Sequence, residues 1–507
     1  MTLEAAGVSQ SIQNIVLKAQ AENIPRKIVI AGTYENGKTI VDEVPELSLN
    51  SSVTGSIYGF GSMLHRLHLE AEMGSAGIQT YIQPQAEVAG SAADGEVDFT
   101  GSSGVLSGTL SFYIGFDLIR VSVFDSDTPT LLGGKLANAI NADESLNFTA
   151  ANLAGVVTLT SKTIGVYGNF AKFSINREPG QKTPAGIVVA ITQPTGGAGL
   201  PDIQDALDGL GTGDASNELH FTALIHGYGQ DSTTLDAIKN YVGVGDEVVG
   251  LYDKDVARPF YSITGDTGAG SAGLSDLLDI GALRTTDRAN SIFPVPGSKS
   301  HPSEIGAQVV GHIERIANIR PAECYTDTEL IRIDPGDSAE RWTNDRDDRT
   351  IAKQNGISSS LVEAGVVLIK DTITLYHPNT IPVNSNIYRQ IANICKIQNM
   401  LDSLKVTYKS PTFKGAIIVQ DANKVGSAIV RLKVIDEDIV RGVLFGLIDS
   451  WVDNAWIFES SFAKKNLVVA LREATDGFNS ITKAILSGVG ESYDNQILAD
   501  TSTAILG

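Results

Sequence analysis

Cysteine, methionine and tryptophan are scarce in this chain of 507 residues, which has two, four and three of them. The two cysteines, Cys324 and Cys395, lie far apart, and neither has a second Cys or a His at the spacing of a zinc-ligand pair. This excludes a disulfide framework and a zinc knuckle as organising features. We therefore expect both thiols to be reduced.

Long apolar runs are also missing. No stretch approaches 18 uninterrupted apolar residues, and the first 25 residues lack the basic head and apolar run of a secretory signal. The sequence therefore predicts neither a membrane span nor Sec export, and we expect a protein made in a cytosol.

Basic residues are outnumbered by acidic ones, 38 against 59, which gives a formal charge of -21. Such a balance argues against broad electrostatic binding to nucleic acid or to an anionic membrane. The charge is unevenly distributed, because the residues from Ser385 onward carry 13 basic and 13 acidic side chains. The acidity therefore belongs to the first three quarters of the chain.

What is present is enough apolar sequence, 42% of the residues, for a sizeable core in several domains. Short apolar runs typical of a parallel sheet alternate with helical segments, which predicts an α/β domain. The expected strands are 27–32, 78–84, 221–227 and 248–253. A helix is expected over 302–318, with Pro302 at its first position and Pro321 just beyond its end.

A β-rich module interrupts this α/β domain. Strict alternation puts Leu110, Phe112 and Ile114 on one face of a strand, and four further runs with strand patterns follow at 118–124, 155–162, 171–176 and 186–192. One helix is expected around 130–141. The flanking sequences are rich in Gly, Ala and Pro, as expected where one domain is inserted into a loop of another.

The last part of the chain predicts a separate α+β domain. Asp436, Glu437 and Asp438 place negative charge at a helix start, and apolar residues follow at helical spacing to Trp451. A second helix is expected over 387–404. Four strands are expected around these helices, at 404–409, 415–420, 427–434 and 465–473.

The motifs tested for chemistry are weak. Gly59 and Gly61 open a helix, but Leu64 stands where a dinucleotide fingerprint needs its third glycine. The glycine-rich run 264–273 lacks a phosphate-binding lysine and is interpreted as a mobile surface loop. His65 and His68 could share a metal, although exposed helix histidines are the commoner case.

The segment 332–350 is rich in carboxylates but lacks the residue order of a calcium loop. Interleaved arginines at 341, 346 and 349 favour a solvated, salt-bridged loop. We identify no catalytic residue, no metal site and no cofactor site.

Three phrases resemble a known family, the contractile-tail sheath proteins of myophages and most closely the Mu-like group. They are YGFGSMLHRLHL at 58–69, the module sequences that begin SGTLSFYIGFDLIRVSV, and TIAKQNGISSSLVEAGVVLIKDTITLY at 350–376. Together they span most of residues 55–376. The resemblance implies a structural motor part without turnover, whose subunits stack as six-start helical rings around a tail tube.

The resemblance also implies a domain plan, an α+β / α/β multidomain fold. A central α/β sheath domain (25–89 and 196–384) carries the inserted outer β-rich domain (90–195), and an inner α+β domain follows (385–486). The termini, 1–24 and 487–507, are then arms. Such segments either fray or add a strand to a neighbouring subunit.

The arm strands that we expect to pair with the C-terminal domain of a neighbour are two short runs. The first is Val8, Ser9, Gln10, Ser11, Ile12, Gln13, Asn14, Ile15, Val16 and Leu17, and the second is Asn495, Gln496, Ile497, Leu498, Ala499, Asp500, Thr501, Ser502, Thr503, Ala504, Ile505 and Leu506. Lys464 and Lys465 are candidates for contact with the tube, on charge alone, against the simpler interpretation of a solvated turn.

The implied partners are further copies of the chain, the tail tube protein, and baseplate and tail terminator proteins, with no nucleic acid and no inserted membrane segment. The implied location is the virion tail sheath, after assembly in the host cytoplasm. Two other functions remain open at this point. A β-rich surface or adhesion protein would explain residues 90–195, and an α/β enzyme with a cryptic site would explain the alternation of strands and helices.

Overall fold

The computed structural model describes residues 21–211, 219–243, 250–252, 256–378, 387–427, 430, 433–472 and 476–488. These residues form two compact units. The larger contains Asn23–Gln398, and the smaller contains Asn399–Ser487 together with the residues that precede Asn23. The structure is of mixed α/β type with several separate sheets, as the sequence predicts.

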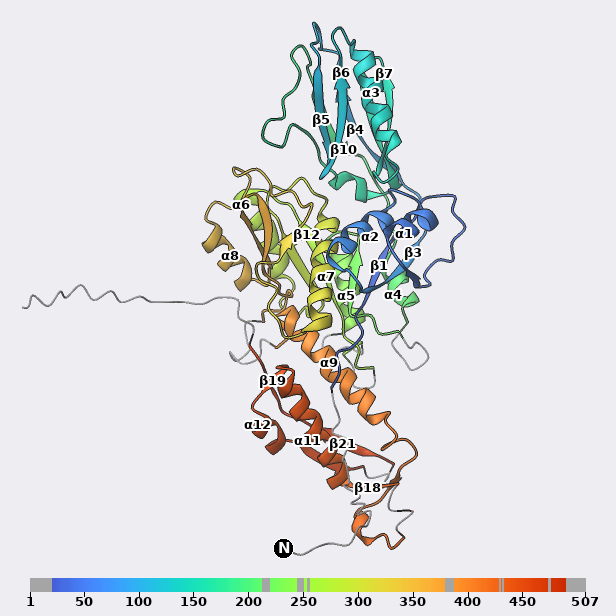
Figure 1. The fold of residues 1–507 in the computed structure, drawn as a ribbon, viewed down its shortest axis with the longest axis vertical. Coiled ribbons are helices and arrows are strands. Elements are labelled where there is room, and N and C mark those ends of the chain that lie inside the picture. Colours follow the sequence, from blue (N-terminus) through green and yellow to red (C-terminus); the bar gives the residue numbers. More distant parts are fainter. Residues whose placement is uncertain are drawn as a thin grey trace, which may run out of the picture. The chain divides into compact units, whose positions relative to one another are not determined.

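A mostly parallel sheet forms the centre of the larger unit (Figure 1). Its strand order is β13-β12-β11-β1-β3-β2, and β2 is antiparallel to β3 at one edge. The strands are β1 (Lys27–Thr33), β2 (Glu46–Ser48), β3 (Gln79–Gln85), β11 (Ala223–His226), β12 (Tyr261–Asp266) and β13 (Asn290–Pro294). The middle strands are buried on both faces, which explains their nearly continuous apolar sequences.

One expected strand of this sheet is wrong. Within the predicted strand 248–253, the described residues Leu251 and Tyr252 form a turn, and residues 244–249 and 253 lie outside the described part. The position beside β11 is taken by β12, where Ser262 and Thr264 break up the apolar pattern that would mark a buried strand.

Helices cover the sheet and fill the connections. They are α1 (Ser51–Tyr58), α2 (Met63–Gly74), α4 (Ile203–Gly209), α5 (Ser232–Val242), α6 (Gly270–Ala282), α7 (Pro302–Ile319) and α8 (Asp345–Gln354). The predicted helix 302–318 is confirmed as α7, with Pro302 in its first turn. Helices α2 and α7 lie side by side (Figure 1), and a small antiparallel sheet of β14 (Glu329–Leu330), β15 (Ser359–Glu363) and β16 (Val366–Asp371) completes this part.

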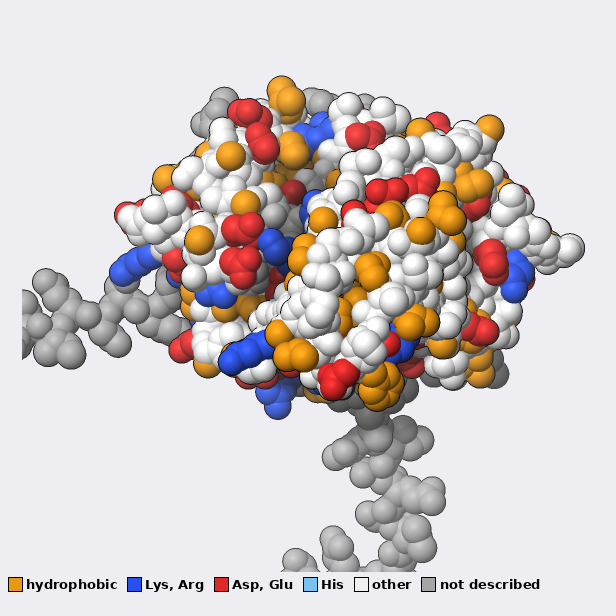
Figure 2. Space-filling model, turned by 90° about the horizontal axis from the view of Figure 1, so that it is seen from above, with side chains coloured by type: hydrophobic (Ala, Val, Ile, Leu, Met, Phe, Trp, Pro, Cys, Tyr) orange, Lys and Arg blue, Asp and Glu red, His pale blue; other side chains and the backbone are white. Residues whose placement is uncertain are grey.

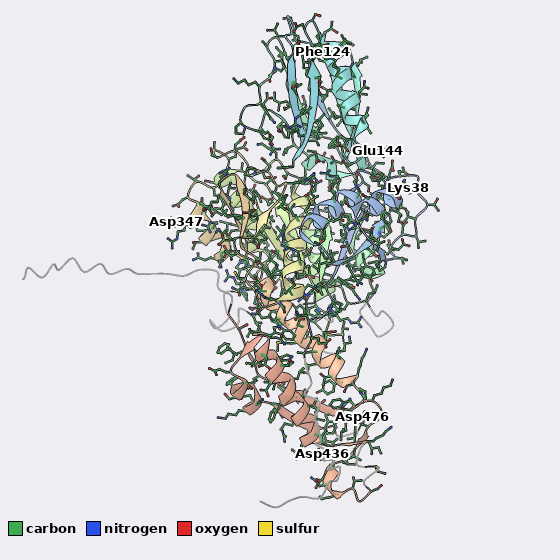
Figure 3. All side chains as sticks on the ribbon, in the orientation of Figure 1. Lys38, Phe124, Glu144, Asp347, Asp436 and Asp476 are labelled. Atoms are coloured by element: carbon green, nitrogen blue, oxygen red, sulfur yellow. The ribbon has the colours of Figure 1, made fainter. Side chains whose placement is uncertain are left out.

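The β-rich module within the same unit has two antiparallel sheets, one α-helix and one short 3-10 helix. The strands are β4 (Ala92–Asp98), β5 (Gly108–Ile114), β6 (Asp117–Val123), β7 (Phe148–Leu153), β8 (Val156–Ile164), β9 (Phe173–Ile175) and β10 (Ala190–Thr195), and the helices are α3 (Pro129–Ala142) and the short 3-10 helix η1 (Val166–Phe170). Leu110, Phe112 and Ile114 lie on β5 and belong to the module's apolar core, as predicted, although Ser111 and Tyr113 between them are buried as well. The strand expected at 186–192 begins only at Ala190. Phe124 lies at the end of the module that is remote from the central sheet (Figure 3).

The smaller unit is built around helix α11 (Glu437–Asp453). Asp436 caps it, because its carboxylate accepts from the amide of Ile439 at 3.0 Å, as the acidic start predicts. The indole of Trp451 on α11 donates to Ser403 at 2.9 Å. Short strand pairs surround α11: β17 (Ile417–Ile418) with β18 (Val434–Ile435), β19 (Ile457–Phe458) with β22 (Ile485–Leu486), and β20 (Val468–Leu471) with β21 (Phe478–Ile481).

Two expectations in this region are corrected. The strand predicted at 404–409 is wrong, because α9 (Ile391–Tyr408) continues through it; Ser403 and Thr407 are both buried, and their spacing of four is helical. The predicted helix 387–404 is therefore displaced toward the C-terminus. Half of the predicted strand 427–434 lies outside the described residues; of the rest, Val430 is helical and Val434 begins β18.

Candidate functional site

The two histidines considered as metal ligands are buried parts of the fold. His65 accepts from the Gly61 amide at 3.0 Å, and His68 lies 2.6 Å from the Thr54 hydroxyl. Burial lowers the pKa of both imidazoles to about 4, so they are neutral at physiological pH. The expectation that helix histidines are exposed is wrong here, and the described residues contain no group of three His, Cys, Asp or Glu side chains placed to hold a metal ion.

The glycine-rich run 264–273 is a strand end and a helix start rather than a mobile loop. Strand β12 runs to Asp266, and α6 begins at Gly270. The Asp266 carboxylate accepts from the amide of Gly268 at 2.8 Å. The Gly268 amide, which a bound phosphate would need as a donor, is therefore already bonded to the Asp266 carboxylate. This agrees with the absence of a phosphate-binding lysine from the run 264–273.

The segment 332–350 is partly helical, which corrects the expectation of a loop. Helix α8 begins at Asp345, and Arg349 pairs with Asp345 at 3.0 Å across one turn. Arg341 donates to the carbonyls of Pro335 and Gly336. The salt-bridge interpretation therefore holds for Arg349, whereas Arg341 binds main-chain carbonyls of the same segment.

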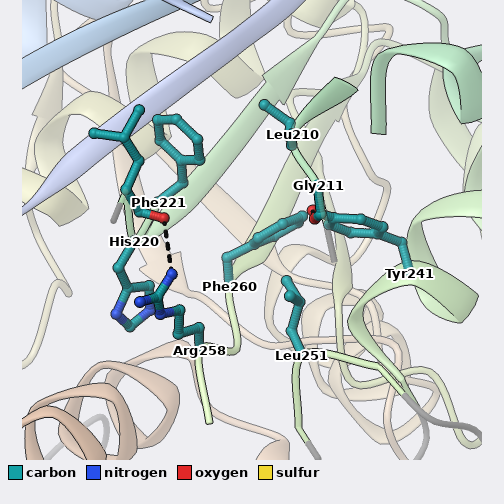
Figure 4. A pocket seen from close by; sticks show the side chains of 9 residues that line it. Leu210, Gly211, His220, Phe221, Tyr241, Leu251, Arg258 and Phe260 are labelled. Atoms are coloured by element: carbon teal, nitrogen blue, oxygen red, sulfur yellow. Dashed lines mark hydrogen bonds between the residues drawn. The ribbon is translucent and has the colours of Figure 1, made fainter. Parts of the chain in front are cut away.

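A pocket at the starts of β11 and β12 has room for little more than one water molecule (Figure 4). Its volume is about 20 Å³. Arg258 donates to the Leu219 carbonyl at 3.4 Å beside it, and the Tyr241 hydroxyl donates to the Gly211 carbonyl at 2.5 Å. Such a space is far smaller than the cavities that hold substrates.

A cluster of five charged side chains lies where the β-rich module meets the central domain. Arg66 binds Glu304 at 2.8 Å and Asp117 at 2.8 Å, and Arg332 binds Asp117 at 2.6 Å. Glu70 lies within 3.7 Å of Arg332. Burial alone would raise the pKa of Glu304, but Arg66 outweighs it and the pKa is lowered. For Glu70, burial and the charge of Glu304 prevail over both arginines and raise the pKa to about 8.

The raised pKa of Glu70 predicts a pH effect on stability. The folded protein retains this proton up to about pH 8, whereas an unfolded glutamate releases it near 4.5. Stability therefore falls as pH rises between these values, since the folded state binds more protons than the unfolded state. We expect Glu70→Gln, which cannot ionise, to remove this part of the pH dependence. The check is thermal unfolding of both proteins at pH 5, 6, 7 and 8. Parallel curves of Tm against pH would contradict the assignment.

Lys464 and Lys465, the candidates for tube contact, end the short helix α12 (Ser460–Lys465) rather than forming a turn. Lys464 pairs with Asp449 on α11 at 2.5 Å, and its ammonium group lies 5.7 Å from the centre of the Phe445 ring. Lys465 is exposed. Lys464 is therefore bound in an ion pair, whereas Lys465 faces solvent.

The strand pair β20–β21 exposes an apolar surface that sequence reasoning missed. Val468 is 56% exposed and Ile481 is 62% exposed, and they are directly opposite each other in the ladder. Val469 faces inward and is buried. Among the described residues no third strand joins this pair at either edge. A two-stranded ribbon is marginal in water, and an open edge can accept a further strand.

The two expected arm strands, Val8–Leu17 and Asn495–Leu506, lie outside the described residues. The last described residues are anchored, because the Ser487 hydroxyl donates to the Ala455 carbonyl. In the part of the chain that the structure describes, no helix is long and apolar enough to cross a membrane.

A comparison with known proteins gives one curated relative with extensive similarity. The chain is 24% identical over 429 residues to the Mu-like prophage FluMu tail sheath protein of Haemophilus influenzae, which covers 82% of this chain and 81% of that protein. This match confirms the resemblance to Mu-like tail sheath proteins. No protein-family model matches the sequence.

Among solved structures, similarity extends over nearly whole chains at low identity. The sheath tail protein of Desulfitobacterium hafniense is 12% identical with a TM-score of 0.45, covering 95% of this chain and 100% of that one. The sheath tail protein of Listeria innocua is 11% identical with a TM-score of 0.44, covering 92% and 97%. A chain of the anti-feeding prophage baseplate in its contracted state is 10% identical with a TM-score of 0.44, covering 99% and 100%.

Proposed function

We propose that this chain, which is similar to a Mu-like tail sheath protein over four fifths of its length, is the structural subunit of a contractile phage tail sheath. The observation that carries the proposal is that sequence match. The subunit polymerises helically around a tail tube and performs no catalysis. It is made in the host cytoplasm and becomes part of the virion tail, where baseplate and tail terminator proteins close the assembly at its ends.

The proposed mechanism stores energy in the assembly. A metastable extended lattice, separated by a barrier from a compact lattice of lower free energy, can shorten without nucleotide hydrolysis. Shortening drives the tube through the host envelope. Subunits can rearrange as rigid bodies only if each remains tied to its neighbours, and contacts that do not close on themselves produce the helical polymer.

The proposed ties are the arm strands, residues 8–17 and 495–506. Main-chain ladders hold while the contacts between globular domains exchange. The open strand pair β20–β21 supports this proposal, since it offers unpaired edges beside the exposed pair Val468 and Ile481. A strand added from a neighbouring copy would cover these side chains.

For the tube, we propose a contact through the smaller unit, whose part of the sequence is electrically balanced. A balanced surface avoids the repulsion that the acidic remainder of the chain would exert on an acidic tube. Lys465 is the better candidate of the lysine pair, because Lys464 is already bound to Asp449.

The test is negative-stain electron microscopy of the purified full-length protein. We expect hollow striated tubes from the full chain, and none from chains that lack residues 1–20 or 489–507. Ile481→Asp should also abolish tubes, because a charge on the open strand opposes addition of a further strand. Its matched control is Ile319→Asp at the end of α7, where the side chain is similarly exposed at 68%.

All variants are first checked for native circular dichroism, so that loss of tubes is not loss of folding. Discrete particles at every concentration of the full-length protein would overturn the sheath proposal. Tubes from both truncated chains would overturn the role of the arms alone.

A further inference from the structure

The β-rich module is attached to the central domain through a narrow neck, which we define as residues 86–91 and 196–202. The two segments are bridged at Ser91 and Ala198 by backbone hydrogen bonds of 2.9 and 3.0 Å. They touch so closely that a Cβ on Gly90 would lie 1.9 Å from the Ala198 carbonyl oxygen. Tyr167 packs beside the neck into the central core, but the module's own apolar core is a separate cluster.

Outside the neck itself, the module also contacts the central domain through the Tyr167 and His301 rings, whose centres lie 4.0 Å apart, and through the Lys162 ammonium, which donates to the Phe60 carbonyl at 3.3 Å. The ionic part of the contact centres on Asp117. This carboxylate belongs to the module, at the start of β6, and its side chain is 14% exposed. One oxygen binds Arg66 of α2 at 2.8 Å, and the other binds Arg332, in the segment after β14, at 2.6 Å. Burial disfavours the charge on Arg66, but Asp117 and Glu304 outweigh it and raise the pKa of the guanidinium. One module carboxylate therefore joins two separate elements of the central domain.

A second ion pair crosses the same junction with the charges reversed. Arg177 of the module binds Asp334 and donates to the Gly115 carbonyl at 2.5 Å. Asp334 is held in place by the amide of Lys299 at 2.6 Å. The junction therefore contains ion pairs of both polarities, with the carboxylate on the module in one and on the central domain in the other.

A cleft of about 590 Å³ runs beside these ion pairs. The module lines it with Tyr113, Phe116 and Arg177, and the central domain lines it with Arg332 and Pro335. Figure 2, which looks down on the module, shows a hollow bordered by basic and acidic side chains. Its arginines are already paired with carboxylates, which disfavours an anionic ligand. Across the cleft, the Arg332 guanidinium lies 6.0 Å from the centre of the Phe116 ring, so this arginine contacts the module through the ring as well as through Asp117.

We propose that Asp117 is a latch that holds the module against the central domain, and that the module pivots on the neck when its ion pairs with Arg66 and Arg332 are broken. Without the charge on Asp117, Arg66 retains Glu304, but Arg332 loses its close partner and can turn to water, since it is already 32% exposed. The cleft then opens while each domain keeps its own core. The latch belongs to the single subunit and does not depend on sheath assembly.

The test is hydrogen–deuterium exchange of the full-length chain, read by mass spectrometry, for the wild type, Asp117→Asn and Arg332→Gln. We expect amides on the cleft walls, residues 113–118, 177–178 and 332–334, to exchange about tenfold faster in both variants. Exchange in the module core at 157–159 should stay unchanged. The matched control is Glu96→Gln, which removes a negative charge from an exposed position on β4.

Faster exchange on both walls from either variant supports the latch, because a substitution on one domain then affects the other. Unchanged exchange on the walls overturns it. Faster exchange throughout the module also overturns it, because Asp117 would then maintain the module's own fold. Equally fast exchange on the cleft walls in Glu96→Gln would show that the effect comes from the change in net charge, and it would also overturn the latch.

Discussion

Replacing Arg26 by methionine is expected to lower the free energy of unfolding of the larger unit by about 3–5 kcal/mol. Arg26 and Glu314 form an ion pair at 3.6 Å, and both side chains are completely buried. Methionine has a similar length but no charge, so Glu314 would be left as an uncompensated buried carboxylate. The cost of that charge exceeds the attraction that the pair provides in the native protein.

The surroundings of the pair make the cost difficult to avoid. The Arg26 guanidinium also donates to Gln398 at 2.5 Å and to the Cys395 carbonyl at 3.2 Å. Glu314 accepts from the Tyr261 hydroxyl at 2.7 Å. Arg26 directly precedes β1, and the other groups belong to α9, α7 and β12. Because four separate elements surround the pair, no small local movement exposes either charge to water.

The measurement is urea unfolding followed by circular dichroism, with Arg320→Met as the matched control. Arg320 pairs with Glu323 at 3.4 Å but is 73% exposed, so its loss should cost less than about 1 kcal/mol. The double variant Arg26→Met/Glu314→Gln should recover part of the loss, because it removes both charges. Equal effects of Arg26→Met and Arg320→Met would show that the buried charge is tolerated.

The elements that the sequence predicts correctly have an uninterrupted local pattern. Helix α7 combines a proline at its start with regular apolar spacing, and β1 is a continuous apolar run between polar residues. Of the two wrong strands, 248–253 is a short apolar run whose period does not distinguish a strand from other structure, whereas 404–409 alternates apolar and polar residues as a strand does and is nevertheless helical. Contacts with other parts of the fold determine the conformation of such segments. In α9, for example, the Ser403 hydroxyl accepts from the Trp451 indole.

The charged junction could not be anticipated from sequence. Arg66 and Glu304 are 238 positions apart, and Asp117 and Arg332 are 215 positions apart. Nothing in the local sequence of YGFGSMLHRLHL distinguishes Arg66 from a surface arginine. The open strand pair leaves no periodic signal in the sequence, because residues 468–471 are all apolar, and their exposed and buried positions appear only in the fold.

The crossing of α2 and α7 supports this junction, because α2 carries Arg66 and Glu70 and α7 carries Glu304. At its other end the helices touch through their backbones. A Cβ on Gly311 would lie 2.3 Å from the Ala71 carbonyl oxygen, and one on Gly74 would lie 2.5 Å from the amide of His312. Both obstacles are main-chain atoms, so no side chain can rotate away to make room.

Gly311→Ala is therefore expected to destabilise the larger unit by about 1–3 kcal/mol, and Gly311→Leu by more, because the helices must separate. The matched control is Gly134→Ala in α3, where the nearest atom to a new Cβ is the Asn152 amide nitrogen at 3.7 Å. That change should stabilise the protein by about 0.5–1 kcal/mol, since alanine favours the helix and no backbone stands in its way. The same substitution thus has opposite signs at the two positions, which urea unfolding resolves. Stabilisation by Gly311→Ala would show that the helices are not in backbone contact. Destabilisation by Gly311→Ala but not by Gly134→Ala would identify the close approach of α2 and α7 as the cause.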